Sequence, residues 1–359
     1  MVPAWLKAYF HSAPNNQLSY AKFIALCLYE PQHGYYMKPR KKLGKQGDFY
    51  TSPYVHAVFA EVVADHVFTH IQAHKLPAQI LEWGAGDGQF AEHFLTYWES
   101  CYETLFPLSY SIIETSSYHR QLLAERFSNK TNVRIAQSLS HLKEHYPSYE
   151  GIILSNELFD AFPVHVVQQI DNKLYEIQVA IQEDKLVEVV VPCTNKQLLH
   201  WLHTYYPPLK NGQRLELSLG VESWYKEVTE WLSVGFIYSF DYGYTNAELW
   251  EPQHFNGSLR GYYQHKLIPN PLCHPGDMDL THHIHFDTLQ RVGSSFGLQS
   301  EPWLSQRQFL LVNGILNKVV SQLNADPFSK GAKRNRAIHS FLTGGFSDSF
   351  RLLIQSKLP

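Results

Sequence analysis

Short apolar runs and amphipathic segments alternate along the middle of the chain. The apolar runs predict strands at residues 79–81, 110–113, 133–136 and 151–154, and the spacing of apolar residues predicts helices at 90–97 and 118–127. Strands and helices that alternate in this way form a parallel sheet covered by helices. The pattern therefore predicts an α/β protein with a Rossmann-like sheet, in which ligands bind at the carboxyl ends of the strands.

Other patterns flank this core. Helical spacing predicts helices at residues 18–28, where Ser19 is placed to cap the helix, and at 54–70. After residue 163 the chain becomes rich in β-forming residues, with runs at 164–170, 174–181 and 186–191 that are separated by polar turns. We expect an inserted antiparallel element there.

The remaining segments are expected to complete the insertion and the sheet. Their predicted elements are helices at 196–205, 222–232, 285–296 and 308–323, strands at 214–219, 235–240, 298–303 and 350–355, and an irregular segment at 245–275. The chain then divides into a helical region at 1–77, the first half of the core at 78–163, the inserted subdomain at 164–234, and the second half of the core at 235–359, which carries a loop insertion at 245–285.

The stretch at residues 80–90 carries the strongest local signal. An apolar run leads to Glu82, then to glycines at positions 84, 86 and 88, and then to a helical segment. A strand, a glycine turn and a helix N-terminus form a cradle for a polar small molecule. The spacing is GxGxG, whereas a dinucleotide site has GxGxxG. Glu82 would repel a pyrophosphate but suits a ligand with an ammonium group, such as the methionine part of S-adenosylmethionine. The alternative is a turn that binds nothing.

Acidic and amide side chains follow two other predicted strands. Glu114 ends the second strand, where a carboxylate can accept hydrogen bonds from both hydroxyls of a ribose. Asn156, Glu157 and Asp160 follow the fourth strand. A helical turn would place Glu157 and Asp160 on one face, where they could orient a cationic acceptor or take its proton. Asn156 could hold an edge of the substrate or of the cofactor. The alternatives are an ordinary charged strand end for Glu114 and a helix cap for Asn156.

Composition excludes several classes of protein. The 359 residues are 44% hydrophobic with a net charge of −3, so a large core is expected. The short basic stretches at 38–42 and 330–336 are expected to be solvated loops rather than nucleic-acid sites. Four separated cysteines favour neither a zinc site nor disulfides. No membrane span or targeting segment is recognised, so we expect a cytoplasmic protein without a membrane or nucleic-acid partner.

Histidines gather at His282, His283 and His285, with Asp279 shortly before them. Metal-dependent hydrolysis is the function that such a cluster could support. However, the cluster lacks the HExxH spacing, and a chain with 20 histidines is expected to cluster some of them by chance. We therefore expect no metal site.

Seven motifs, taken in order, resemble the MidA family of S-adenosylmethionine-dependent methyltransferases, whose mitochondrial members are protein arginine methyltransferases acting in respiratory complex I assembly. The motifs are YEPQHGYY at 29–36, GDFYTSP at 47–53, EWGAGDG at 82–88, SNELFDAFP at 155–163, DYGY at 241–244, GSLRGY at 257–262 and DLTHH at 279–283. Together they extend over nearly the whole chain, so the set is far more specific than the glycine loop alone.

The resemblance implies a class I methyltransferase core with an N-terminal helical region, an inserted β-rich subdomain, and S-adenosylmethionine as cofactor. It also implies that the loop at 47–52 covers the cofactor and that the following residues bind it: Gly47, Tyr50, Thr51, Ser52, Glu82, Gly84, Ala85, Gly86, Gly88, Glu114 and Asn156. Asn156, Glu157 and Asp160 would face the methyl acceptor. The chain departs from the family at His285, where many members have an acid, and at Ala85, where many have proline.

We therefore expect a methyltransferase that modifies a protein side chain, with arginine as a candidate acceptor. Such an enzyme mainly aligns the acceptor with the reactive sulfonium and excludes water. Glu157 and Asp160 would position a guanidinium and offset its charge. A cofactor-binding assembly factor without turnover is the alternative, while the GxGxG spacing disfavours a nicotinamide oxidoreductase. The sequence leaves the acceptor and the oligomeric state open.

Overall fold

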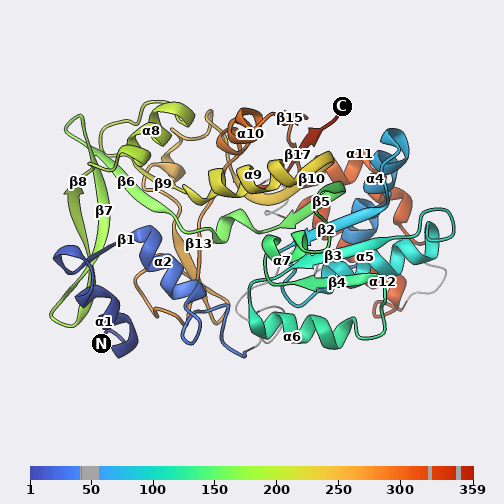
Figure 1. Ribbon diagram of the computed structural model, residues 1–359, viewed down its shortest axis with the longest axis horizontal. Coiled ribbons are helices and arrows are strands. Elements are labelled where there is room, and N and C mark those ends of the chain that lie inside the picture. The colour runs from blue at the N-terminus through green and yellow to red at the C-terminus, as the bar shows by residue number, and fades with distance from the viewer. Residues whose placement is uncertain (41, 43–55, 322–325, 345–348) are drawn as a thin grey trace. The chain divides into compact units, whose positions relative to one another are not determined.

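The computed structural model describes the chain except for residues 41, 43–55, 322–325 and 345–348 (Figure 1). The chain folds into two compact units, each assembled from segments that are far apart in the sequence. Unit 1 comprises Met1–Phe49, Phe159–Glu227 and Gly243–Phe296, and unit 2 comprises Tyr50–Leu158, Val228–Tyr242 and Gly297–Pro359.

Unit 2 is built on a mixed sheet with the strand order β15-β17-β10-β5-β2-β3-β4. Its strands are β2 (Gln79–Trp83), β3 (Ser109–Ile113), β4 (Val133–Ala136), β5 (Tyr149–Asn156), β10 (Leu232–Tyr244), β15 (Gln299–Ser300), β16 (Leu304–Ser305) and β17 (Phe350–Lys357). The strands from β10 to β4 are parallel, and β17 runs antiparallel to β10. The chain order reverses between β2 and β5, and ligands of parallel sheets bind at such a reversal.

Helices bury one side of this sheet in a continuous core. The helices of unit 2 are α4 (Val58–His74), α5 (Gln89–Cys101), α6 (Ser117–Arg126), α7 (Leu139–Lys143), α11 (Gln306–Val312), α12 (Lys330–Thr343) and the 3-10 helix η4 (Ile315–Lys318). Val63 of α4, Phe94 of α5 and Ile152 of β5 are fully buried in the same cluster, to which α11 and α12 also contribute. Each such side chain stabilises the fold by about 1.5–3 kcal/mol. The predicted Rossmann-like α/β sheet is confirmed.

Two predictions for the last part of unit 2 were wrong. The helix expected at 308–323 ends at Val312, because Gly314 adopts φ +78° and only the short η4 follows. Of the strand expected at 298–303 only the two residues of β15 form, and β16 begins after the predicted range; between them lies Pro302, which has no N–H group to donate to a strand ladder.

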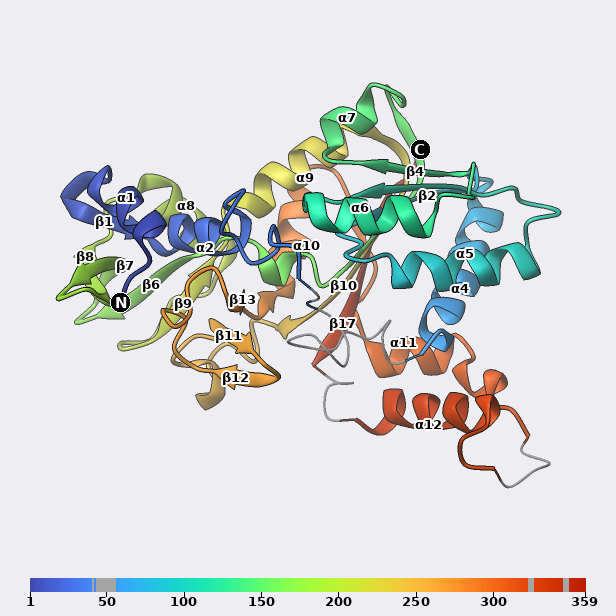
Figure 2. The same ribbon diagram turned by 90° about the horizontal axis from the view of Figure 1, so that it is seen from below.

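The basic stretch at 330–336 was predicted to be a solvated loop, and this prediction was also wrong. It forms the first half of α12, and Ser329 caps the helix by accepting a hydrogen bond from the Ala332 N–H group at 3.1 Å. Figure 2 shows α12 beside α11, at the margin of unit 2.

Unit 1 contains two antiparallel sheets. The larger has the order β1-β7-β6-β9 with β8 beside β7, and the smaller has the order β12-β11-β13. The strands are β1 (Gln17–Ser19), β6 (His165–Ile170), β7 (Lys173–Gln182), β8 (Lys185–Pro192), β9 (Arg214–Leu217), β11 (Arg260–Tyr263), β12 (Lys266–Ile268), β13 (Asp279–Thr281) and β14 (Ile284–His285), the last paired with the end of β10. The inserted antiparallel element is therefore confirmed.

The helices of unit 1 cover these sheets. They are α1 (Ala4–His11), α2 (Tyr20–Tyr29), α8 (Lys196–Tyr205), α9 (Gly220–Trp231), which continues into unit 2, α10 (Phe286–Ser295), and the 3-10 helices η1 (Pro14–Asn16), η2 (Phe159–Ala161) and η3 (Pro252–His254). Ser19 caps α2 as predicted, with the Lys22 N–H group 3.2 Å from its hydroxyl. Phe23, Ile177 and Leu280 belong to one buried core.

The segment at 245–275 was predicted to be irregular, but it contains the β11–β12 hairpin. Its turn residues Gln264 and His265 have φ +49° and +60°. Such a two-residue turn is ordinarily signalled by Asn or Gly. The sequence therefore lacks the usual hairpin signal, although the structure has the hairpin geometry.

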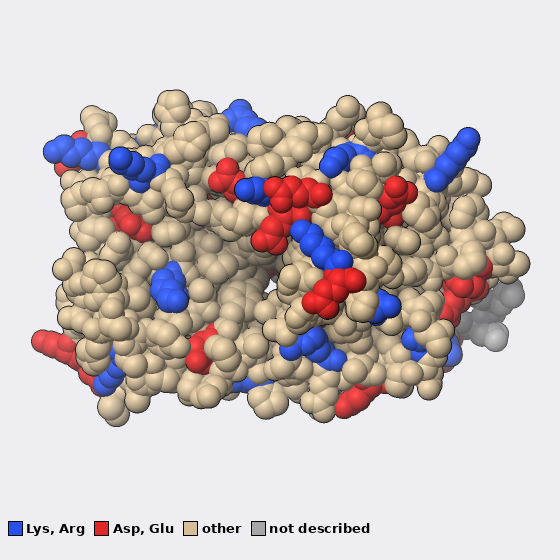
Figure 3. Space-filling model, viewed as in Figure 1, with Lys and Arg blue, Asp and Glu red and all other residues tan. Residues whose placement is uncertain are grey.

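The surface is mixed in charge over the face that Figure 3 presents, where Lys and Arg lie among Asp and Glu. In the part of the chain that the structure describes, no helix is both long enough and apolar enough to cross a membrane.

Candidate active site

The glycine loop begins where β2 ends, at the point of strand-order reversal. The Gly84 N–H group donates to the Ile113 carbonyl at 2.8 Å and so fixes the start of the loop against β3. Gly84, Gly86 and Gly88 have φ of +79°, +58° and +83°, which favour glycine. A Cβ atom at Gly88 would lie 2.5 Å from Leu123 Cδ2, so glycine also allows α6 to pack here.

Glu114 lies directly against this loop. Its carboxylate accepts hydrogen bonds from the Gly86 N–H group at 2.9 Å and from the Ser116 N–H group at 2.8 Å, and its side chain is buried. The structure thus brings together two features that the sequence placed 28 residues apart. Each carboxylate oxygen can accept more than one hydrogen bond, so Glu114 can hold the loop and still receive ligand hydroxyls.

Glu82 is the second acid of this region and is also buried. The Tyr110 hydroxyl donates to its carboxyl group at 2.8 Å. The pKa of Glu82 is raised to about 8, mainly by burial and with a contribution from the charges of Glu114 and Asp87, while the Tyr110 hydrogen bond opposes the shift. A cation bound beside Glu82 would stabilise the carboxylate form, which burial alone disfavours.

Asn156 ends β5, the neighbour of β2 across the strand-order reversal. Its amide nitrogen donates to Glu157 Oε1 at 3.2 Å. Its oxygen Oδ1 is buried and has no hydrogen-bond partner among the described residues. A buried acceptor left without a donor costs about 1–3 kcal/mol, so this oxygen fits a site that a ligand donor completes.

Glu157 and Asp160 do not share the helical turn predicted for them. Glu157 has φ +53°, and its N–H group donates to the Phe240 carbonyl at 2.8 Å, which continues the pairing of β5 with β10. Only Phe159–Ala161 forms a helical turn, a 3-10 turn in unit 1. The alternative of Asn156 as a helix cap is equally wrong, because Asn156 is the last residue of a strand.

Asp160 is buried in unit 1, where its partners come from much later in the chain. Its oxygen Oδ2 accepts the Thr281 hydroxyl at 2.9 Å, and its carbonyl accepts the His282 N–H group at 3.2 Å. Asp279 lies two residues before Thr281, on the same face of β13. Its carboxylate accepts a hydrogen bond from the Tyr36 hydroxyl at 2.8 Å. Burial, Asp279 and Asp160 raise the pKa of Tyr36 well above its usual value.

Tyr36 and Thr281 were not predicted as site residues, and Asp279 was considered only as a metal ligand beside the histidine cluster. The sequence did indicate that Asp279 and Thr281 lie close together, because residues two apart in a strand point to the same side of the sheet. Nothing in the sequence indicated that Asp160 would lie beside them, since 121 residues separate Asp160 from Thr281.

Ala85 lies within the glycine loop and packs against the core of unit 2. The predicted cofactor-covering residues Gly47, Tyr50, Thr51 and Ser52 lie outside the described residues.

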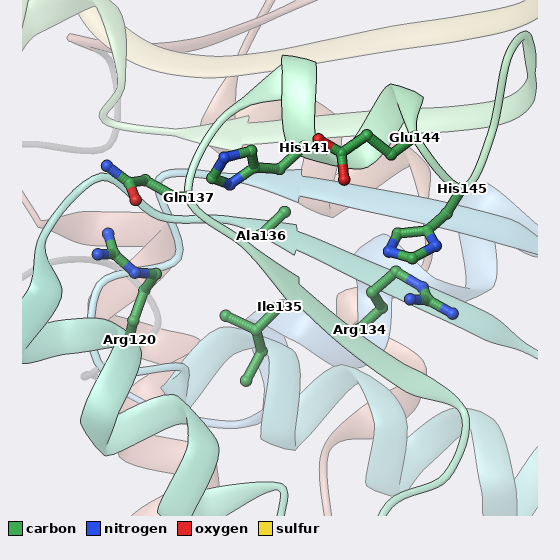
Figure 4. Close-up of a pocket in the computed structure, with 8 residues that line it drawn as sticks. All are labelled: Arg120, Arg134, Ile135, Ala136, Gln137, His141, Glu144 and His145. Atoms are coloured by element: carbon green, nitrogen blue, oxygen red, sulfur yellow. The ribbon is translucent and has the colours of Figure 1, made fainter.

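A cavity of about 430 Å³ is lined by residues of α6, of β4 and its carboxyl end, and of α7 and the turn after it (Figure 4). It is lined by Arg120, Arg134, Ile135, Ala136, Gln137, His141, Glu144 and His145. Arg120 connects the cavity lining to Glu114, since its guanidinium donates to the carbonyls of Glu114 at 2.9 Å and Thr115 at 2.6 Å. Gln137 follows β4 at the carboxyl edge of the sheet.

The histidine cluster shows no metal geometry. Among the described residues, no group of three or more His, Cys, Asp or Glu side chains is arranged to hold a metal ion. His285 is buried, stacks on Tyr206 with ring centroids 4.4 Å apart, and lies 2.5 Å from the Thr288 hydroxyl through Nδ1. Burial lowers the pKa of His285 to about 3. The side chain is therefore neutral near pH 7 and cannot replace the charge of an acid.

Comparisons with known proteins agree with this architecture. The model of a family described as "Putative S-adenosyl-L-methionine-dependent methyltransferase" matches residues 62–302. The mitochondrial protein arginine methyltransferase NDUFAF7 homolog of Drosophila melanogaster is 28% identical over 302 residues, 77% of this chain and 67% of the relative. The mitochondrial protein arginine methyltransferase NDUFAF7 of Mus musculus is 26% identical over 324 residues, 83% of this chain and 71% of the relative.

A solved structure shares the fold. A protein from Burkholderia thailandensis, crystallised with S-adenosyl-homocysteine, has a TM-score of 0.87 and 24% identity, covering 99% of this chain and 91% of that protein.

The parallel sheet with one antiparallel strand, the glycine loop after β2 and the acid after β3 together define a class I methyltransferase. The chain belongs to the MidA family of S-adenosylmethionine-dependent methyltransferases, because the family match covers more than half of its length. The residues present fit this cofactor. They offer a buried acid for an ammonium group, a carboxylate for hydroxyls, and the open acceptor Asn156 Oδ1.

Proposed function

We propose that this methyltransferase acts on a protein side chain, with arginine as the acceptor. The observation that carries the acceptor proposal is the buried carboxylate of Asp160, fixed by the Thr281 hydroxyl. A buried carboxylate attracts a cationic group such as a guanidinium. The names of the relatives support the same acceptor, since both are protein arginine methyltransferases.

The roles proposed for the cofactor-side residues follow from their chemistry. Glu82 holds the ammonium group of the methionine part, the glycine loop with Ala85 admits it closely, and Glu114 receives the ribose hydroxyls. Asn156 Oδ1 accepts one further donor. When bound, S-adenosylmethionine supplies a methyl group on a positively charged sulfur.

On the acceptor side, Glu157 and Asp160 hold and orient the cationic side chain. Their negative charges offset the charge of the guanidinium, and a carboxylate within reach can take the proton that the nitrogen loses as it gains a methyl group. The proposed contribution of these side chains is thus orientation, charge balance and a proton acceptor.

Methyl transfer to a lysate tests this proposal. With S-adenosylmethionine labelled in its methyl group, we expect labelled protein bands, and mass spectrometry is expected to locate the label on arginine. Glu157→Gln and Asp160→Asn should each lower the labelling rate by at least about tenfold, because each removes a charge that orients the acceptor. Cofactor affinity, measured by calorimetry, should change little.

Glu92→Gln is the matched control, since Glu92 is an exposed acid of the same chain that pairs with Arg126. Undiminished labelling by the double variant of Glu157 and Asp160 would show that these roles are wrong. Cofactor binding without any labelled acceptor would instead support an assembly factor that lacks turnover.

The raised pKa of Glu82 predicts a pH dependence of ligand binding. An ammonium group beside Glu82 favours the carboxylate form, so binding S-adenosyl-homocysteine below about pH 8 should release a proton. We expect the affinity to rise by up to about tenfold per pH unit between about pH 5 and 7, and to level off above about pH 8. Calorimetry in two buffers of different ionisation enthalpy measures the released proton.

The same shift affects folding in the free protein. Because the pKa is raised from 4.5 to about 8, the stability from protonated Glu82 is fully present below about pH 4.5 and is lost as the pH rises through about 8. Glu82→Gln should remove both effects. A pH-independent affinity of the unsubstituted protein would contradict the placement of the ammonium group at Glu82.

A further inference from the structure

Exposed apolar side chains are concentrated in one short part of unit 2. Of the twelve large apolar side chains that are exposed in the described chain, six lie between residues 311 and 328. They are Leu311, Val312, Leu316, Val319, Val320 and Phe328, which we call the apolar rim. Val312 and Phe328 are the most prominent, with 73% and 78% of their surface accessible. A group of large exposed apolar side chains, unlike single scattered ones, can mark an interaction site.

The apolar rim is firmly attached to α12. The Val320 N–H group donates to Asn335 Oδ1 at 3.0 Å, and the Asn335 amide donates back to the Val320 carbonyl at 2.8 Å. The Arg334 guanidinium donates to the Lys318 carbonyl at 2.7 Å and forms two bonds to Glu61 of α4 at 2.7 and 2.6 Å. These bonds hold η4, the following residues and α12 as one surface on the body of unit 2.

Exposed cationic side chains belong to the same part of the chain as the apolar rim. Lys330, Lys333 and Arg336 are exposed on α12, and Arg307 is exposed on α11. Among the described residues from 306 to 344, Asp326 is the only acid. Lys318 and Arg334 are already paired with acids of α4. The remaining exposed side chains of this segment carry four positive charges and one negative charge, which is a net charge of +3. The whole chain has a net charge of −3, which makes this local excess distinctive.

We propose that the apolar rim and these exposed cations bind the surface of an anionic lipid bilayer. Aliphatic and phenylalanine side chains enter the boundary between headgroups and acyl chains, while lysine and arginine contact lipid phosphates. Protein-binding surfaces are instead enriched in Tyr, Trp and Met and depleted in Lys, which this surface does not match. The sequence-based expectation of no membrane partner concerned spanning segments, whereas this contact is peripheral. It is independent of the acceptor proposed above.

Vesicle sedimentation with the full chain tests this proposal. We expect binding to phosphatidylcholine vesicles that contain phosphatidylglycerol to exceed binding to phosphatidylcholine alone by at least about tenfold, and to weaken in high salt. The double variant Val312→Ser with Phe328→Ser should lower binding by about tenfold or more, because it removes apolar surface from the boundary. Lys330→Glu with Lys333→Glu should have a similar effect.

Leu105→Ser is the matched control, since Leu105 is an equally exposed apolar residue of unit 2, with 77% of its surface accessible. It should bind vesicles like the unsubstituted protein, and all variants should keep their unfolding temperature. The proposal fails if anionic vesicles do not bind, or if Leu105→Ser loses as much binding as the rim variants. It also fails if the rim variants change only the solution mass of the protein or its retention on polyglutamate, because the surface would then bind a second copy or an acidic protein.

Discussion

Glu114→Ala is expected to weaken the binding of S-adenosylmethionine by at least about a hundredfold, the largest effect of any single side chain on function. Hydrogen bonds to a charged group contribute about 1.5–3 kcal/mol each, and two ribose hydroxyls would lose theirs. The substitution also removes the acceptor of the Gly86 and Ser116 N–H groups, and with it the contact that fixes the glycine loop to the end of β3. Calorimetric titration with cofactor measures the loss.

Two further variants separate ligand contact from loop support. Glu92→Ala removes an exposed acid of the neighbouring helix α5 and should leave the affinity within about twofold. Glu114→Gln keeps one acceptor oxygen and should bind more tightly than Glu114→Ala. If Glu114→Ala bound cofactor as well as Glu92→Ala, the carboxylate would have no part in the site.

Gly235→Ala is expected to lower the free energy of unfolding by about 3 kcal/mol or more. Gly235 of β10 pairs with Gly151 of β5 in the middle of the parallel sheet. A Cβ atom at Gly235 would lie 1.9 Å from the Gly151 carbonyl oxygen, and the φ of +148° is unfavourable for other residues. The obstacle is backbone, so no side-chain rotation relieves it and the two strands would have to separate.

Gly297→Ala provides the comparison. Gly297 has φ +87°, but a Cβ atom there would meet nothing within 4 Å. It should therefore cost only about 1 kcal/mol, from the left-handed backbone alone. Thermal unfolding followed by tryptophan fluorescence measures both variants. If both variants lowered the unfolding temperature equally, the clash between a Cβ atom at Gly235 and the neighbouring strand would contribute nothing beyond the strain of the backbone conformation.

Much of unit 2 could be predicted because its signals are local. The strands at β2 to β5 are apolar runs bounded by polar residues, and the turn after β2 needs glycine at positions where φ is positive. Glu82 and Glu114 adjoin strand ends, so their placement at the carboxyl edge followed from the α/β pattern. The hydrogen bond between Glu114 and Gly86 did not, because it depends on two parallel strands becoming neighbours.

Other local predictions failed where the backbone departs from common patterns. The spacing of Glu157 and Asp160 is compatible with a helical turn, but the left-handed φ of Glu157 prevents one. The hairpin turn places Gln264 and His265 at positive φ, where such turns usually have Asn or Gly. In both cases the tertiary environment imposes a conformation that the local sequence does not favour.

The sequence by itself determined the alternation of strands and helices, the inserted antiparallel element, and the loop and acids typical of a methyltransferase, because hydrophobic period and glycine geometry act over a few residues. Only the tertiary structure decided that Asp160 meets Thr281, that Tyr36 meets Asp279 across 243 residues, and that the apolar side chains between residues 311 and 328 stay exposed. Such contacts depend on how distant segments pack against each other, and no local pattern encodes that packing.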